Sequence, residues 1–280
     1  MPTDPLAPLL DLPGVVDAVA ESRRSIDALL GHRVLRRRSA EVTAESALRG
    51  ARASAQLEGA GIELERLRGQ LLTGGTVEPH NRDPRTGAVV RAAVRLHADL
   101  GQVLGSWRRS PAQALAKLHV IAAADLVDDP DALGRPRPAG AAYEDPLGLG
   151  PAPDPLEVSA RLEGLSRVLL ATKAPAVVVA GVVHGELLAL RAFGSADGLV
   201  ARAAARLVLV DRGLDPKAVS APEVGHVELE HEYETAALAY VSGGPDGVAQ
   251  WLVHSARAIG LGALEGRAVC EALVRETPRA

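Results

Sequence analysis

Apolar residues recur at helical spacing along most of the chain, and runs that alternate apolar and polar residues are scarce. Glycine and proline separate these apolar stripes, as is typical of helix ends. We therefore expect a mainly α-helical protein of about ten helices. The expected spans are 15–30, 39–59, 62–71, 83–105, 111–126, 156–170, 175–190, 199–210, 222–241, 247–259 and 264–274.

The two most continuously apolar spans are 175–190 and 199–210, and we expect them to form a central pair with Phe193 buried at the base of the loop between them. The longest stretch without helical periodicity is 128–155, which is rich in proline and glycine. It predicts a loop with at most a short β-hairpin. These features divide the chain into an N-terminal helical region (1–75), a core (76–220) and a C-terminal helical extension (221–280).

Composition narrows the functional classes. The 280 residues are 47% apolar and 24% charged, with a net charge of -4. The resulting pI of about 6.1 argues against an electrostatic nucleic-acid interface. No stretch is long and uncharged enough to span a bilayer, and no basic segment followed by an apolar run opens the chain, so we expect no membrane partner and a cytoplasmic location. The one cysteine, Cys270, excludes an intramolecular disulfide.

Common catalytic motifs are absent from the sequence: there is no GxSxG, Walker loop, GxGxxG or HExxH. The segment from His226 to Glu234 holds two histidines and four glutamates, but the spacing of His226 and His231 does not stack them on one helical face. We interpret it as a solvated acidic helix start and assign no metal site. His119 and His184 fall in apolar helices, which is typical of core histidines.

Residues 191–202 read Arg-Ala-Phe-Gly-Ser-Ala-Asp-Gly-Leu-Val-Ala-Arg and follow a proline-rich stretch and two expected helices. The next apolar helix ends in Gly-Leu-Asp-Pro. This order resembles the Fic (Fido) domain family, whose motif is HxFx(D/E)GNGRxxR. Phe193, Gly198 and Arg202 match it. The resemblance implies a Fic-like helical fold with at most a short β-hairpin flap, and transfer of AMP or related groups to protein hydroxyls. Gly198 and Arg202 are the positions it implies for binding a phosphate-containing ligand.

A second family feature lies upstream. Many Fic proteins carry an inhibitory helix with the pattern (S/T)xxxE(G/N), whose glutamate pairs with the last arginine of the motif and blocks productive ATP binding. Ser54, Glu58 and Gly59 fit this pattern. The resemblance implies that Glu58 faces Arg202. The alternative is an ordinary helix end with Glu58 in solvent.

Five motif positions depart from the family, among them Ala196, which replaces the first glycine of the phosphate nest. The base, a histidine in the family, is Arg191, which stays protonated near neutral pH. The acidic Mg²⁺ ligand is Ser195, the phosphate nest contains Asp197, and the first arginine clamp is Leu199. AMP transfer of the family type is therefore not expected. A structural alternative is a surface ion pair between Arg191 and Asp197, with Ser195 or Asp197 capping the next helix.

These departures favour a catalytically degenerate Fic-domain protein that acts as a binding or regulatory module with a protein partner. We assign no cofactor and no metal, and lean against an enzyme. The alternative is an active nucleotidyl- or phosphate-group transferase of altered chemistry, in which Arg191 and Arg202 bind a small anionic ligand. ATP and Mg²⁺ are expected as cofactors only under this alternative. A purely structural helical partner is a third hypothesis, and a homo-oligomer is compatible with all three. Arg135 and Arg137, where the family has its flap, are interpreted as a solvated loop or as a site for an acidic partner.

Overall fold

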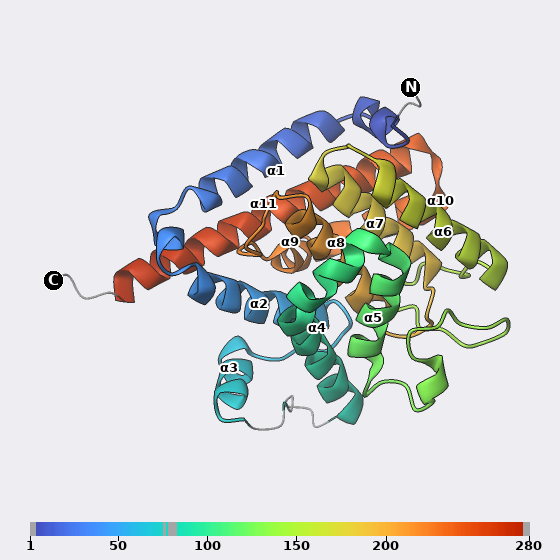
Figure 1. Cartoon of the computed structure of the whole chain (residues 1–280), viewed down its shortest axis with the longest axis horizontal. Coiled ribbons are helices and arrows are strands. Elements are labelled where there is room, and N and C mark those ends of the chain that lie inside the picture. Colours follow the sequence, from blue (N-terminus) through green and yellow to red (C-terminus); the bar gives the residue numbers. More distant parts are fainter. Residues whose placement is uncertain (1–3, 75–76, 78–82, 277–280) are drawn as a thin grey trace.

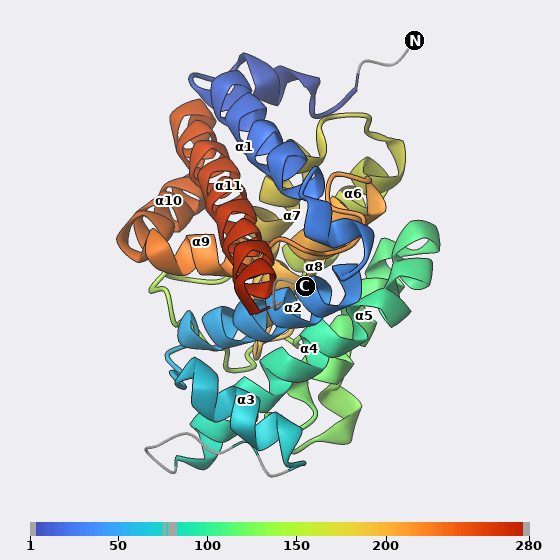
Figure 2. The same ribbon diagram turned by 90° about the vertical axis from the view of Figure 1, so that its left-hand side faces the viewer.

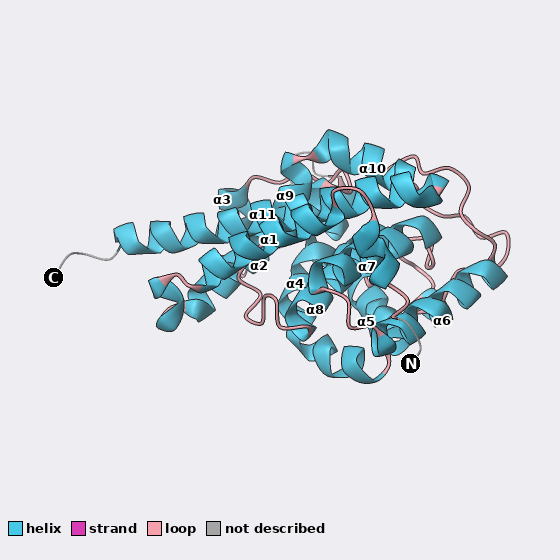
Figure 3. Cartoon of the chain, turned by 90° about the horizontal axis from the view of Figure 1, so that it is seen from above, coloured by secondary structure: helices cyan, strands magenta, loops and turns pink. Residues whose placement is uncertain are grey.

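The computed structural model describes residues 4–74, 77 and 83–276. These residues contain eleven α-helices and three short 3-10 helices. Figure 3 shows helices and loops and no strand among them. The predicted mainly α fold is thus confirmed, and the described part of 128–155 forms no hairpin strands. The helices are α1 (Val15–Leu30), α2 (Ser39–Gln56), α3 (Leu64–Leu72), α4 (Pro84–Arg109), α5 (Pro111–Ala123), α6 (Pro155–Ala171), α7 (Ala176–Leu190), α8 (Asp197–Asp211), α9 (Pro222–Glu228), α10 (Glu230–Ser242) and α11 (Gly244–Glu276).

Helices α7 and α8 form the centre of the molecule (Figure 1). They pack along each other, α7 also contacts α11, and α8 contacts α4 and α5. Almost every residue of α7 is buried, from Val177 through Leu190 with the exception of Glu186. The predicted central pair is therefore confirmed. Helix α1 runs beside α11 on the far side from α4 and α5, as the second view shows (Figure 2).

The C-terminal region differs from the prediction in two places. The expected helix 222–241 is divided at Leu229 into α9 and α10, and the two expected helices 247–259 and 264–274 form one continuous α11. Glycines were interpreted as helix breaks, but Gly262 lies where α11 crosses the backbone of Ala221 and Pro222. A Cβ on Gly262 would lie 2.5 Å from the Pro222 nitrogen. This glycine allows close helix packing and does not end the helix.

The predicted division at residues 75 and 220 stays a prediction, and residues 75–76 lie outside the described residues. Helices from the three predicted parts contact one another: α2 packs on α4 and α9, and α11 packs on α7. In the part of the chain that the structure describes, none of the helices combines the length and apolarity that crossing a membrane requires.

Candidate functional site

The motif loop joins the two central helices. Arg191 ends α7 with φ 42° and Ala196 precedes α8 with φ 55°, both in the left-handed region that non-glycine residues seldom adopt. The Asp197 carboxylate accepts hydrogen bonds from the backbone N–H groups of Phe193 (3.0 Å) and Gly194 (2.8 Å). The interpretation of Asp197 as a helix cap is therefore wrong. It is the first residue of α8, and its side chain holds the preceding loop in its tight turn.

Asp197 is also electrostatically unusual. Burial raises its pKa to about 7; the two loop N–H groups act in the opposite direction, and the charges of Glu58 and Glu144 add to the rise. Because Asp197 replaces the family's asparagine, a titratable group now occupies a position that is neutral in the family motif.

Arg191 lies in the position of the family's base, inside the protein. Its side chain is 4% exposed, and its Nη1 lies 3.0 Å from Oδ1 of Asp145. Its guanidinium lies 5.3 Å from the centre of the Tyr143 ring, and none of its nitrogens makes a hydrogen bond within the described residues. The expected surface ion pair is wrong, since the pair is formed in the interior with a carboxylate from the loop before α6. A buried arginine paired with Asp145 has no lone pair with which to accept a proton.

The segment 134–145, at the family's flap position, lies against the motif loop. The Arg137 N–H donates to the Ala192 carbonyl (2.8 Å), and the Glu144 N–H donates to the Gly194 carbonyl (2.9 Å). The Arg137 side chain is buried and its Nε donates to the Arg191 carbonyl at 3.1 Å. The solvated interpretation is thus wrong for Arg137, whereas Arg135 is exposed.

Ser195, in the position of the metal ligand, lies beside a histidine that the sequence did not connect with the site. His119 Nε2 is 3.4 Å from Ser195 Oγ, and its Nδ1 accepts the N–H of Gly134 at 2.9 Å. Because Nδ1 is an acceptor, the neutral ring carries its proton on Nε2, and His119 cannot act as a base toward Ser195. Burial lowers the pKa of His119 to about 4, which keeps the ring neutral.

Phe193 packs face to face with His119, with ring centres 4.2 Å apart. It packs against the core but is only half-buried, less than the buried position expected for it. Leu199 is buried in α8 and offers no polar atom to a ligand. His119 could not be placed from the sequence because 76 residues separate it from Ser195, and only the packing of α5 on α8 brings them together.

Glu58 at the end of α2 contacts Arg202 on α8. Its Oε1 lies 2.5 Å from Nη2, and Ser54 contributes its Oγ (2.8 Å from Nε) and its carbonyl (3.0 Å from Nη2). The side chains of Arg202 and Glu58 are 2% and 9% exposed. The predicted contact is confirmed and the alternative of a solvent-exposed Glu58 is wrong. A Cβ on Gly198 would collide with Glu58 Oε1, so this carboxylate lies against the first turn of α8, where the helix dipole favours negative charge.

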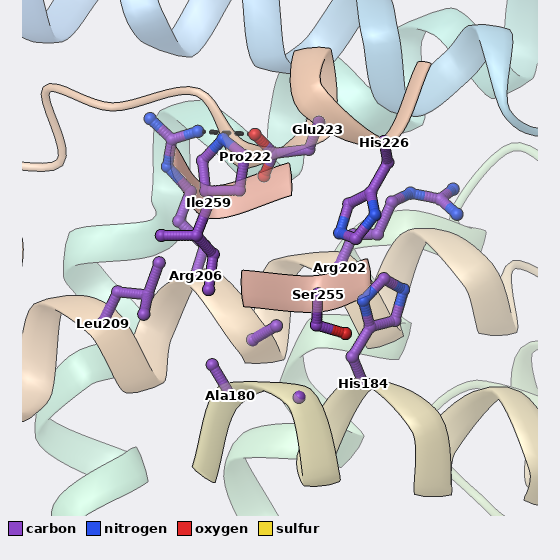
Figure 4. Close-up of a pocket in the computed structure, with 12 residues that line it drawn as sticks. Ala180, His184, Arg202, Arg206, Leu209, Pro222, Glu223, His226, Ser255 and Ile259 are labelled. Atoms are coloured by element: carbon purple, nitrogen blue, oxygen red, sulfur yellow. Dashed lines mark hydrogen bonds and ion pairs between the residues drawn. The ribbon is translucent and has the colours of Figure 1, made fainter. Parts of the chain in front are cut away.

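Behind Arg202, side chains from α7, α8, α9 and α11 converge on a small internal cavity of about 20 Å³ (Figure 4). Tyr233 accepts from Arg202 Nη1 at 3.2 Å and lies 3.0 Å from His184 Nε2. Burial is the main cause that lowers the pKa of His184 and of His226 well below its usual value. His226 is buried beside His254, so its interpretation as part of a solvated helix start is wrong. No group of three histidine, cysteine or acidic side chains in the described residues is arranged to hold a metal.

Solved structures with the same architecture are Fic proteins. A Fic family protein from Desulfovibrio desulfuricans G20 superposes with a TM-score of 0.72 at 22% identity, over 92% of this chain and 75% of that chain. Fic-1 from C. elegans superposes with a TM-score of 0.65 at 15% identity, over 96% of this chain and 75% of that chain. A Fic domain containing signaling protein from Bacteroides thetaiotaomicron VPI-5482 gives 0.61 at 12% identity, over 91% and 98%.

The chain therefore has the all-α Fic fold, as the motif predicts. No protein-family profile matches it, and no curated protein sequence matches it significantly. The likeness establishes the fold. What the site does must be argued from its own residues.

Proposed function

We propose that this Fic-fold protein is catalytically degenerate for AMP transfer and acts as a binding or regulatory module. The observation that carries the proposal is the burial of Arg191 against Asp145 in the position of the base. General-base catalysis needs a group that accepts a proton near neutral pH. Arg191 cannot do so, and His119, the nearest imidazole to Ser195, has its Nδ1 already engaged by Gly134.

The residues present do not fit Mg²⁺ and ATP. Ser195 provides one neutral oxygen where Mg²⁺ prefers a carboxylate. The cavity beside Arg191 measures about 20 Å³, which is the space of a water molecule, and Glu58, Glu144, Asp145 and Asp197 line it. These carboxylates oppose the negative charge of a triphosphate. The neighbouring opening of about 210 Å³ is lined by Glu58, Glu230 and Glu234, and these carboxylates also oppose the negative charge of a triphosphate.

A protein partner is part of this proposal. The edge of the flap segment that faces the motif loop is already bonded to it through the Arg137 and Glu144 N–H groups. These two donors are not free to bind the main chain of a target peptide. Recognition of a partner therefore falls to the outer surface or to the opening beside Glu58. The cytoplasm, expected from the sequence, stays a prediction.

A second candidate function rests on one observation. Arg191 is buried, yet its Nε, Nη1 and Nη2 make no hydrogen bond within the described residues. A buried arginine without hydrogen bonds is costly, and a small oxyanion between Arg191 and the start of α8 would satisfy it. In the alternative, Arg191 and Arg202 bind a phosphate-containing group for transfer by altered chemistry.

Radiolabelled nucleotides separate the two. The protein and a lysate are incubated with ATP, GTP, CTP or UTP labelled on the α-phosphate, with Mg²⁺, beside a heat-denatured control. We expect no labelling, and none for Glu58→Ala, because base and metal ligand are both missing. A Fic protein with an intact motif is the positive control. Labelling that disappears in Arg191→Met would contradict the proposal and favour transferase activity.

A further inference from the structure

A cavity of about 310 Å³ lies at the opposite end of α8 from the motif loop. Its walls come from α2, α4, the second half of α8 and the segment that follows α8. Binding sites for small molecules span roughly 300–1,000 Å³, so this volume suits a compact ligand. None of the motif residues lines it.

The interior of this cavity is largely apolar. Leu100 and Leu104 on α4 face Leu207 and Val210 on α8. Gly101 also lines the cavity and leaves open space beside it, since a Cβ there would meet no atom within 4 Å. An apolar ligand body would therefore bury its surface against leucine and valine without displacing any side chain of the protein.

All the charged side chains that line this cavity are basic. The charged ones are Arg206 and Lys217, the imidazole of His97 also lines the cavity, and no carboxylate is among the described residues that line it. Arg206 pairs with Glu223 at 2.8 Å and donates to the carbonyls of Ala218 and Ser220, so its donors are engaged. Lys217 is exposed, and its ammonium has one contact, the Leu35 carbonyl at 3.3 Å. Two of the three ammonium hydrogens remain for a ligand.

The backbone at the rim is held in place. Ala218 has φ 51°, a left-handed conformation that is unfavourable for a residue with a Cβ. Two hydrogen bonds fix this turn: Arg206 Nη2 to the Ala218 carbonyl at 3.1 Å, and Thr43 Oγ1 to the Lys217 carbonyl at 2.7 Å. Lys217 is thereby anchored at the mouth of an apolar cavity.

We propose that this cavity binds a small amphipathic carboxylate, with its apolar body between α4 and α8 and its carboxylate at Lys217. The apolar walls provide burial, and the single unpaired ammonium provides the charge that distinguishes an acid from a neutral compound. The ligand would touch α8, which carries Arg202, and α2, which Glu58 follows by two residues. The site is separate from the motif loop and does not depend on what that loop does.

Octanoate is a suitable probe, with octanol and octylamine as neutral and cationic counterparts of the same length. Titration calorimetry on the full chain at pH 7 is expected to show saturable binding of octanoate, at least tenfold weaker binding of octanol, and none of octylamine. Lys217→Met is expected to weaken octanoate at least tenfold and leave octanol unchanged. Gly101→Leu, which fills the cavity, is expected to abolish binding of both.

Two control variants match these changes elsewhere. Gly164→Leu alters another helical glycine with open space around it, and Lys173→Met removes another exposed lysine. Both are expected to bind octanoate as the natural chain does. Should Gly101→Leu fail to fold, Ala98→Leu fills the cavity from an exposed position. The proposal is overturned if octanoate does not bind, if binding survives the filled cavity, or if Lys217→Met binds octanoate undiminished.

Discussion

Glu58 and Arg202, 144 residues apart in the sequence, meet at 2.5 Å between the end of α2 and the first turns of α8. Ser54, one helical turn before Glu58, also accepts from the same guanidinium. Both polar residues of the (S/T)xxxE(G/N) pattern thus contact the last arginine of the motif. The pair is buried, so it contributes to the fold whatever the present role of the cleft.

Breaking this pair is expected to destabilise the protein. Glu58→Ala leaves Arg202 buried without its carboxylate, but Ser54 and Tyr233 still accept from it. We therefore expect the free energy of unfolding to fall by about 1–4 kcal/mol. Breaking a buried ion pair typically costs about 3–5 kcal/mol, and the remaining acceptors should reduce that cost here. Urea unfolding measures this. Glu232→Ala, which breaks the exposed pair with Arg257, is the control and should cost less than about 1 kcal/mol.

A separate variant tests the position of the Glu58 carboxylate. Gly198→Ala places a methyl group where Glu58 Oε1 lies, so it should destabilise the natural chain and do so much less in the Glu58→Ala background. Equal costs in both backgrounds would show that the carboxylate does not lie against α8.

The central helices and the Glu58–Arg202 contact could be predicted because they depend on short-range signals: apolar periodicity and two local motifs. The surroundings of Arg191 could not. The sequence shows that the base is missing, but the partner Asp145 lies in an irregular loop, where no periodicity fixes its position. The continuous α11 was missed for a related reason, since only its packing against residues 219–222 shows why its glycines do not end it.

The ion pair between Arg191 and Asp145 should show energetic coupling. We expect Asp145→Ala to destabilise the natural chain by about 1–3 kcal/mol, because it leaves a buried guanidinium uncompensated while Asp145 itself is 22% exposed. In an Arg191→Met background the same change should cost less. It still loses the hydrogen bonds that Asp145 accepts from the Leu149 and Gly150 N–H groups. A double-mutant cycle by urea unfolding gives the coupling, and a value near zero would contradict the pair.

Stability should fall as the pH is lowered from about 6.5 to 5. Burial lowers the folded-state pKa of His119 and of His254 to about 4, and it also lowers the pKa of His184 and of His226 well below the usual value. The unfolded chain, with a histidine pKa near 6.5, then binds more protons, so each histidine removes up to about 1.4 kcal/mol per pH unit. The raised pKa of Asp197 makes the folded chain bind a proton and so stabilises it at lower pH, but this one group is outweighed by the four buried histidines.

Urea unfolding at pH 5.0, 5.5, 6.0 and 6.5 tests this. His119→Gln keeps an acceptor for the Gly134 N–H and should flatten the profile, whereas His231→Gln changes an exposed histidine and should leave it unaltered. A natural chain equally stable at pH 5 and 6.5 would show that the buried histidines do not control this range.

The last prediction concerns Asp197 and restores the family's asparagine. Its folded-state pKa of about 7 lies above the unfolded value of about 3.9, so between these values the folded chain binds more protons. Stability from this group is therefore present at low pH and is lost as the pH rises toward 7, by about 1.4 kcal/mol per unit. Asp197→Asn does not titrate. The Phe193 and Gly194 N–H groups donate to different oxygens of Asp197, so the single side-chain oxygen of asparagine replaces one of these acceptors, and the lost bond costs the variant the same at every pH. The free energy of unfolding of the variant, minus that of the natural chain, should therefore rise by about 2–3 kcal/mol from pH 5 to pH 8. Urea unfolding at both values measures the difference, with the exposed Asp131→Asn as control. A difference between variant and natural chain that is the same at pH 5 and pH 8 would mean that Asp197 is ionised in the fold throughout this range, and that the loop N–H groups outweigh its burial.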